Sequence, residues 1–90
     1  MNTSATELHK AFEKKDAKAA TALTLPAVRA RYQQIFKEHE DELERVAALL
    51  ATRKLIVVTP EVAEYEVSDG GHKFRITFEK IGGKWFLSSL

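Results

Sequence analysis

No decisive motif is formed by the residues of this sequence that could do chemistry, and among them His39 has the most suggestive setting. It lies in an acidic run, Glu38–Glu42, whose side chains are potential metal ligands. Neighbouring residues of a helix point in different directions, however, and no second histidine lies within a turn of His39. A metal centre needs three or four ligands that converge on one point. We therefore predict a solvated acidic helix face there, with no metal and no cofactor.

Two tyrosines are the other candidates for a site. Tyr32 and Tyr65 fall at apolar positions of their predicted elements, and such a ring can present its hydroxyl at the mouth of a pocket. With His39 they would be the ligand-binding residues of a shallow cavity between a long helix and a sheet. The alternative is that both rings belong to the core, their commoner place. No catalytic residue is predicted, because the sequence contains no nucleophile elbow, phosphate-binding loop or dinucleotide fingerprint.

The sheet that would position these residues is predicted for the C-terminal part of the chain. Leu55–Thr59 is a mainly β-branched run that Pro60 closes, which indicates a first strand. Val62–Leu90 then alternates between apolar and polar residues and contains two glycine pairs, Gly70-Gly71 and Gly82-Gly83. This pattern is typical of three antiparallel strands joined by tight turns.

The first glycine pair predicts how two of these strands align. A two-residue turn at Gly70-Gly71 places Glu66 opposite Arg75. A turn one residue earlier, at Asp69-Gly70, keeps the same faces and places Glu66 opposite Lys73. Both alternatives give an opposite-charge pair on the solvent face, which stabilises the strand pairing.

The residues before the sheet predict helices. Ser4 and Glu7 have the spacing of a capping box, and Asp16 is a second potential N-cap. Pro26 suits the first turn of a long helix, whose apolar residues keep a spacing of three and four over some 25 positions. A break at Glu38–Glu42 is the alternative to one continuous helix, because that run has no apolar residue.

Together these patterns predict one α+β domain. Two to three helices over about residues 4–53 would pack on one face of a curved four-stranded antiparallel sheet over about residues 54–90, NTF2-like or cystatin-like in outline. Ninety residues suffice for one core, with little volume left for a deep pocket.

Composition and charge exclude several classes of protein. Fourteen basic side chains nearly cancel thirteen acidic ones, so no nucleic-acid surface is expected. The sequence has no cysteine, and no apolar run approaches the ~20 residues that span a bilayer. No signal-peptide pattern is present. We therefore expect no membrane insertion and a cytoplasmic location, with a domain excised from an exported envelope protein as the alternative.

Three short stretches resemble the NTF2-like superfamily. They are Ala11–Asp16 followed by Ala20, then Phe74–Lys80, and finally Gly83–Leu87. The sequence looks most similar to the small bacterial domains of unknown function of the DUF4878 and lumazine-binding-like type. The resemblance implies helices over a curved sheet that enclose a cone-shaped cavity, where the enzymes of the family hold acids and tyrosines. This chain is shorter, so a truncated cone is expected, and no catalytic residue of the family maps onto it.

The function that we expect is a non-catalytic binding or protein-interaction module. Trp85 and Phe86 point to opposite faces of the last predicted strand, and Ile56 and Val58 add apolar side chains on the first. An apolar surface built from these four residues would suit a homodimer or another protein partner. The alternatives are a small-molecule binder or enzyme with a shallow cavity, and an accessory domain of a larger envelope protein.

Overall fold

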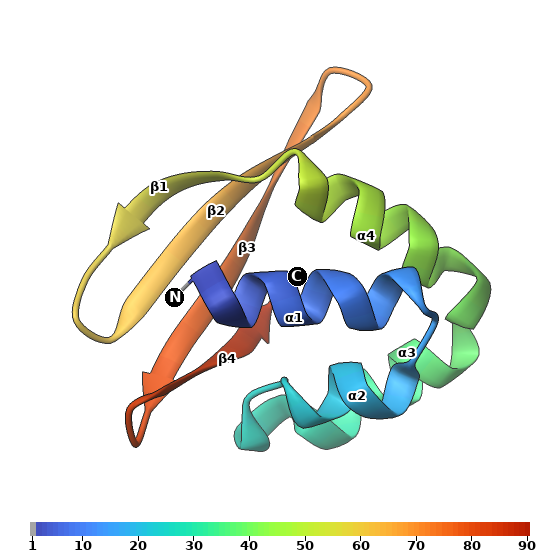
Figure 1. Ribbon diagram of the computed structural model, residues 1–90, viewed down its shortest axis with the longest axis horizontal. Coiled ribbons are helices and arrows are strands. Elements are labelled where there is room, and N and C mark those ends of the chain that lie inside the picture. The colour runs from blue at the N-terminus through green and yellow to red at the C-terminus, as the bar shows by residue number, and fades with distance from the viewer. Residues whose placement is uncertain (1) are drawn as a thin grey trace.

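A four-stranded antiparallel sheet and a layer of helices against one of its faces make up the protein in a computed structural model, which describes residues 2–90 (Figure 1). Its helices are α1 (Asn2–Glu13), α2 (Ala17–Ala22), α3 (Arg29–Glu38) and α4 (Leu43–Ala51), with 3-10 turns η1 (Pro26–Val28) and η2 (Glu40–Glu42). Its strands are β1 (Lys54–Val58), β2 (Val62–Asp69), β3 (His72–Ile81) and β4 (Lys84–Ser89), in that spatial order. The predicted α+β class is confirmed.

The turn between β2 and β3 is the one predicted at Gly70-Gly71. Asp69 pairs with His72, and Glu66 lies opposite Arg75. Both glycines have positive φ, 55° and 92°, as a tight hairpin turn of two left-handed residues requires. The ion pairs run diagonally instead of straight across, from Arg75 to Glu64 at 3.1 Å and from Lys73 to Glu66 at 3.7 Å.

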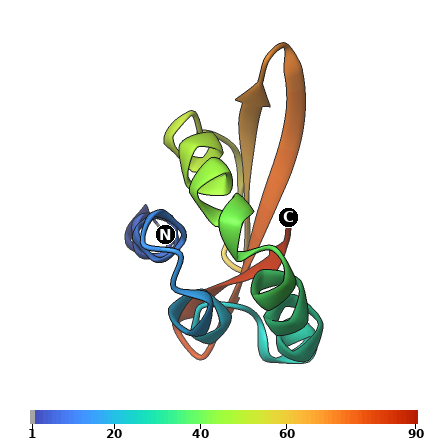
Figure 2. The ribbon, with the colours of Figure 1, turned by 90° about the vertical axis from the view of Figure 1, so that its right-hand side faces the viewer.

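The predicted long helix is interrupted at the alternative break point. α3 ends at Glu38 and α4 begins at Leu43, with η2 between them, and the two helices run in different directions (Figure 2). The break lets Phe36 and Leu43 both enter the core, where they are almost fully buried. Because the acidic residues of η2 lie in the first turn before α4, they also favour a helix start there.

The two predicted N-caps have different outcomes. Helix α1 already includes Asn2 and Thr3, so the prediction that Ser4 caps it is wrong. Several polar residues in a row can each begin a helix, and local sequence does not decide among them. At α2 the prediction is confirmed, because the Asp16 Oδ1 atom accepts a hydrogen bond from the Ala19 amide at 3.0 Å.

Replacing Asp16 with alanine is expected to lower the free energy of unfolding by about 1 kcal/mol, because the Ala19 amide loses its capping acceptor. For a domain of this size that loss shifts the melting temperature by about 4–8 °C. Differential scanning calorimetry measures the shift. Asp16→Asn is the control, since asparagine caps about as well; an equal loss in both variants would show that charge, not capping, matters.

The core lies between the helices and the inner face of the sheet. Alternate residues of the three strands that follow β1 point inward, among them Tyr65, Phe78 and Leu87, all nearly inaccessible. Phe12 of α1 meets Phe36 of α3 edge to face, with ring centroids 5.3 Å apart. The helices are thus joined to one another and to the sheet by a single apolar cluster.

The segment after α2 joins the last strand to the N-terminal half. The Leu87 amide donates to the Leu23 carbonyl at 2.9 Å, and the Leu25 amide donates to the Leu87 carbonyl at 2.7 Å. Thr24 lies between these bonds and forms a parallel bridge with Leu87. One side of β4 is therefore paired with β3 and part of the other with this segment.

Candidate interaction surfaces

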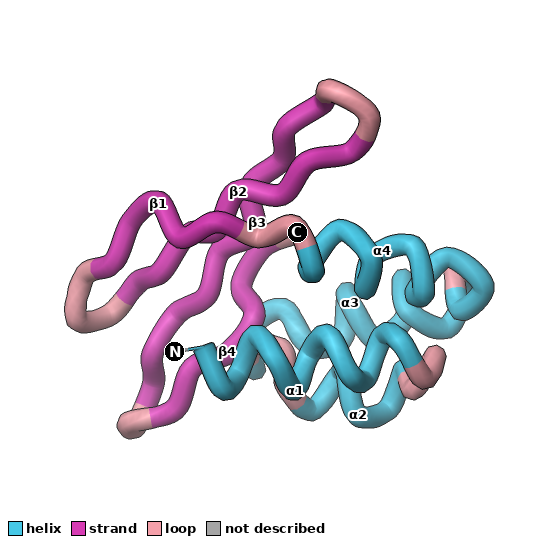
Figure 3. The backbone as a smooth tube through the Cα atoms, turned by 45° about the horizontal axis from the view of Figure 1, so that its top comes forward, coloured by secondary structure: helices cyan, strands magenta, loops and turns pink. Residues whose placement is uncertain are grey.

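Strand β1 is an open edge of the sheet with apolar side chains in solvent. Within residues 2–90 it pairs only with β2, and Figure 3 shows it at one border of the sheet. Four consecutive side chains of β1 are exposed, namely Leu55 (50%), Ile56 (36%), Val57 (40%) and Val58 (57%). A single exposed leucine is ordinary, but an apolar run on a free edge is a template for pairing with another chain.

The backbone of β1 is available as well as its side chains. The Thr59 amide donates to the Val62 carbonyl at 2.8 Å, so Thr59 faces β2. Successive residues of an antiparallel strand alternate in direction. Val58, opposite Ala63, therefore turns its N–H and C=O toward the open edge. A bulge interrupts the register between Leu55 and Val57, and such bulges limit how far an edge can pair.

The four predicted interface residues do not form one surface. Ile56 and Val58 lie on β1, whereas Trp85 and Phe86 lie on β4, with two strands between them. Trp85 packs against the core. Phe86 is half-buried on the opposite side of β4. Alternation predicted the faces of each strand, but it does not say which strands are neighbours.

The three predicted ligand-binding residues meet different partners. The Tyr32 hydroxyl accepts a hydrogen bond from the Leu90 amide at 3.2 Å, and its ring stacks on Phe36. His39 ends α3 in solvent, 3.8 Å from Glu42. Tyr65 is buried in the sheet. The polar atoms of these three residues do not meet at a common point, and both tyrosine rings pack as core residues do.

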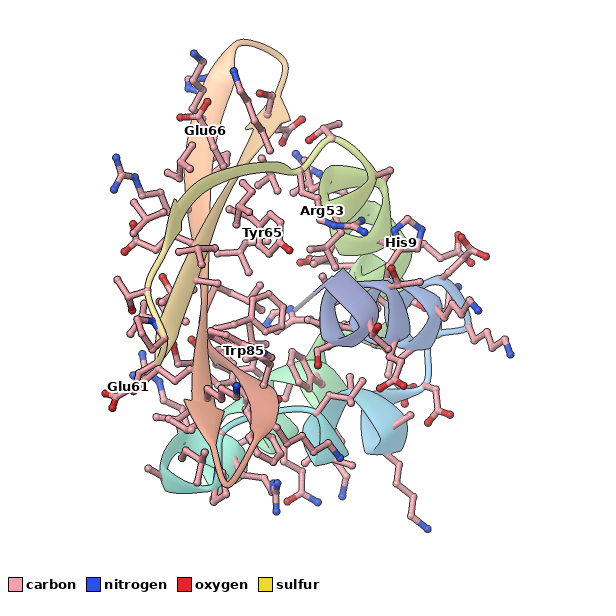
Figure 4. All side chains as sticks on the ribbon, turned by 60° about the vertical axis from the view of Figure 1, so that its left-hand side comes forward. His9, Arg53, Glu61, Tyr65, Glu66 and Trp85 are labelled. Atoms are coloured by element: carbon pink, nitrogen blue, oxygen red, sulfur yellow. The ribbon has the colours of Figure 1, made fainter. Side chains whose placement is uncertain are left out.

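Tyr65 has one polar neighbour of note. The guanidinium carbon of Arg53 lies 5.9 Å from the centre of the Tyr65 ring, a cation–π distance. Figure 4 shows both side chains between the sheet and the helices. Arg53 Nη1 also donates to the Leu50 carbonyl at 3.1 Å, and Nη2 donates to Thr6 at 3.3 Å. These bonds link the end of α4 to α1, and they give Arg53 a structural role.

A groove lies between α4 and the β2–β3 hairpin, and none of the three predicted ligand-binding residues lines it. Its volume is about 310 Å³, and its lining is mostly apolar: Val46, Leu49, Val67, Phe74, Ile76 and Leu90, with Glu42, Arg45 and Asp69 as the charged members. Phe74 is half exposed there. The sequence held one signal for this groove. Phe74 is an apolar residue on the inner face of β3, and β4 has no apolar residue opposite it.

The hairpin beside this groove extends beyond its neighbouring strands (Figure 1). Strand β4 pairs with β3 only from Thr77 to Ile81, so His72–Ile76 has no strand on that side among the described residues. The Lys80 amide donates to the Glu61 carbonyl at 2.8 Å, which shows that even-numbered residues of β3 face β2. By alternation Lys73 and Arg75 turn their backbone groups toward the open side.

Residues 2–90 contain neither a cluster of metal-ligating side chains nor a helix that could cross a membrane. No group of three or more histidine, aspartate or glutamate side chains in that range could hold a metal ion. The same range contains no helix with the length and apolar character that a membrane crossing needs. Comparison with family models, curated proteins and solved structures gave no match to this chain, so the NTF2-like resemblance stays a prediction.

Proposed function

We propose that this protein is a non-catalytic interaction module that self-associates through β1. The observation that supports the proposal is the run Leu55–Val58, four exposed apolar side chains on a strand with an open edge. Pairing would remove these side chains from water, which is the dominant favourable contribution to association. It would also satisfy backbone groups such as those of Val58.

A second copy of the chain is the partner that fits β1 best. Two antiparallel β1 strands related by a two-fold axis place apolar residues opposite apolar residues, so the surface is complementary to itself.

The dimer is expected to be weak. A stable interface buries about 800 Å² on each partner, and a strand of five residues supplies less than that unless neighbouring surface joins it. The bulge in β1 and Pro60 after it shorten the paired segment further. We therefore expect a dimer with a Kd in roughly the micromolar range, which forms and dissociates when the protein concentration changes modestly around that value.

Charging the edge is expected to abolish self-association. In the double variant Ile56→Lys, Val58→Lys, two like-charged strands would meet across the two-fold axis, and sedimentation velocity should show a monomer over about three decades of concentration around the micromolar range. The wild type should pass from monomer to dimer over the same range. Ile81→Lys is the control, because Ile81 is also exposed but lies on β3, which β2 separates from β1, so this variant should still dimerise.

Two results would contradict the proposal. One is a wild type that stays monomeric throughout, and the other is a dimer that survives the charged edge. A loss of fold in the double variant is recognised separately by its circular dichroism spectrum. In that case Ile56→Thr with Val58→Thr, which keeps β-branched residues in the strand, should weaken the dimer while the spectrum stays unchanged.

A further inference from the structure

We infer that the groove between α4 and β3 binds an extended, basic peptide of a partner protein, which adds as a strand to His72–Ile76. This surface is distinct from β1, so the inference does not depend on self-association. It combines two features that occur side by side: a strand segment with an open edge and an apolar groove lined by side chains of the same segment. Peptide recognition by strand addition uses both, since the backbone supplies affinity and the groove supplies specificity.

The backbone of β3 sets the register of such a peptide. Lys73 and Arg75 are the residues whose N–H and C=O groups face the open side. An antiparallel peptide would therefore form its bonded pairs with these two residues. Their side chains lie on the outer face, where they pair with Glu66 and Glu64, so the peptide residues directly opposite them also point outward and can be polar.

The alternate residues of the peptide would enter the groove. Phe74 and Ile76 point to the inner face of β3, and Val46 and Leu49 of α4 lie across from them in the lining. A peptide residue opposite Phe74 points the same way as that ring. It would cover the half of Phe74 that is now exposed. Apolar residues at every second position are thus the expected pattern.

The charged lining favours a peptide that carries a positive charge. Of the three charged residues in the groove, Arg45 already donates to Asp69 at 2.8 Å, and this hydrogen bond and the adjacent carboxylate raise the pKa of Arg45. The charges of Arg45 and Asp69 cancel, so Glu42 gives the groove one net negative charge. A lysine at one end of the peptide would complement it, whereas a glutamate would be repelled.

The test uses a defined probe, the peptide Val-Thr-Leu-Thr-Val-Lys, capped at both ends and labelled with a fluorophore. Fluorescence anisotropy with the Ile56→Lys, Val58→Lys variant measures its affinity without interference from self-association. The same peptide with glutamate in place of lysine should bind about tenfold or more weakly, because it adds a like charge to the groove. No saturable binding of the lysine peptide up to roughly millimolar protein would overturn the inference.

Methylation of backbone nitrogens separates strand addition from other modes of binding. The two threonines of the probe lie opposite Lys73 and Arg75, so N-methylation of both threonines should abolish binding. N-methylation of the leucine should leave it within about threefold, because that N–H points away from β3. Equal affinity of the two methylated peptides would mean that the groove takes apolar molecules without strand pairing, and the inference would be wrong.

A matched pair of protein variants also separates strand addition from binding in the groove without strand pairing. Arg75→Pro removes the N–H that faces the open side but no bond to β2, and should weaken binding at least about tenfold. Arg75→Thr keeps the N–H and removes the same side chain, so it should bind as the parent does. Phe74→Thr, at a half-exposed position, should weaken peptide binding because it removes an apolar contact in the groove while the backbone pairing stays intact.

The alternative occupant of the groove is strand β1 of a second copy of the chain. Each copy would then bind the next one head to tail, and the wild type would form polymers that grow with concentration.

Discussion

Replacing Phe12 with alanine is expected to lower the free energy of unfolding by about 3–5 kcal/mol. Phe12 is fully buried in α1, and its ring meets Phe36 of α3 edge to face, so the deletion leaves a cavity where the helices join the sheet. A domain of ninety residues keeps only about 5–10 kcal/mol of net stability. Urea unfolding followed by the fluorescence of Trp85, the single tryptophan, measures the loss.

The control for this prediction is Phe12→Leu, which keeps most of the apolar volume and should cost clearly less. The slope of free energy against urea reports the surface exposed on unfolding, and it should stay close to the wild-type value in both variants. A cost below about 1 kcal/mol for Phe12→Ala would mean that the neighbouring helices collapse onto the vacated space. The single core that joins the helices to the sheet would then be a wrong description.

Replacing Tyr65 with alanine is expected to have a comparable effect, whereas Tyr65→Phe should be nearly neutral. The ring is buried on the inner face of β2 and meets Phe78 edge to face, with centroids 6.0 Å apart. Loss of a large aromatic side chain from such a site costs about 3–5 kcal/mol. Removal of the hydroxyl alone keeps the packing and the contact with Arg53. Thermal unfolding of the two variants measures the difference.

The same pair of variants decides between the two interpretations of Tyr65. If the residue served a ligand through its hydroxyl, Tyr65→Phe would change binding while it left stability intact. If the ring is a core residue, Tyr65→Ala loses stability and Tyr65→Phe changes neither property. A destabilisation of Tyr65→Phe by more than about 1 kcal/mol would show that the hydroxyl has a buried hydrogen-bond partner that the protein needs.

Local features of the sequence predicted local features of the structure. The turn at Gly70-Gly71 follows from residues that tolerate positive φ, and the end of α3 before Leu43 follows from an acidic run without apolar residues. The cap at Asp16 follows from side-chain chemistry. Each of these depends on a few neighbouring residues, so a pattern in one stretch of chain is enough to predict it.

The candidate surfaces depend on distant parts of the chain and were only partly predicted. The apolar pattern of Leu55–Val58 predicted a strand, but its exposure follows from helices that stop short of β1. Trp85 and Phe86 were grouped with that strand because alternation gives the faces of strands without their order in space. The groove beside Phe74 exists because β4 is shorter than β3, and the sequence indicates this only through an apolar residue of β3 that has no partner on the last strand.

The two bonds of Leu87 with the segment after α2 have a consequence for how the protein is made. About sixty residues separate Leu87 from Leu23 and Leu25, and contacts over such distances form slowly because a long loop must close first. During translation the helices emerge early and can assemble among themselves, but β4 can dock only after residue 87 has left the ribosome. Until then the Leu23 carbonyl and the Leu25 amide lack their partners on β4, so the assembled helices keep an incomplete edge until the last strand arrives.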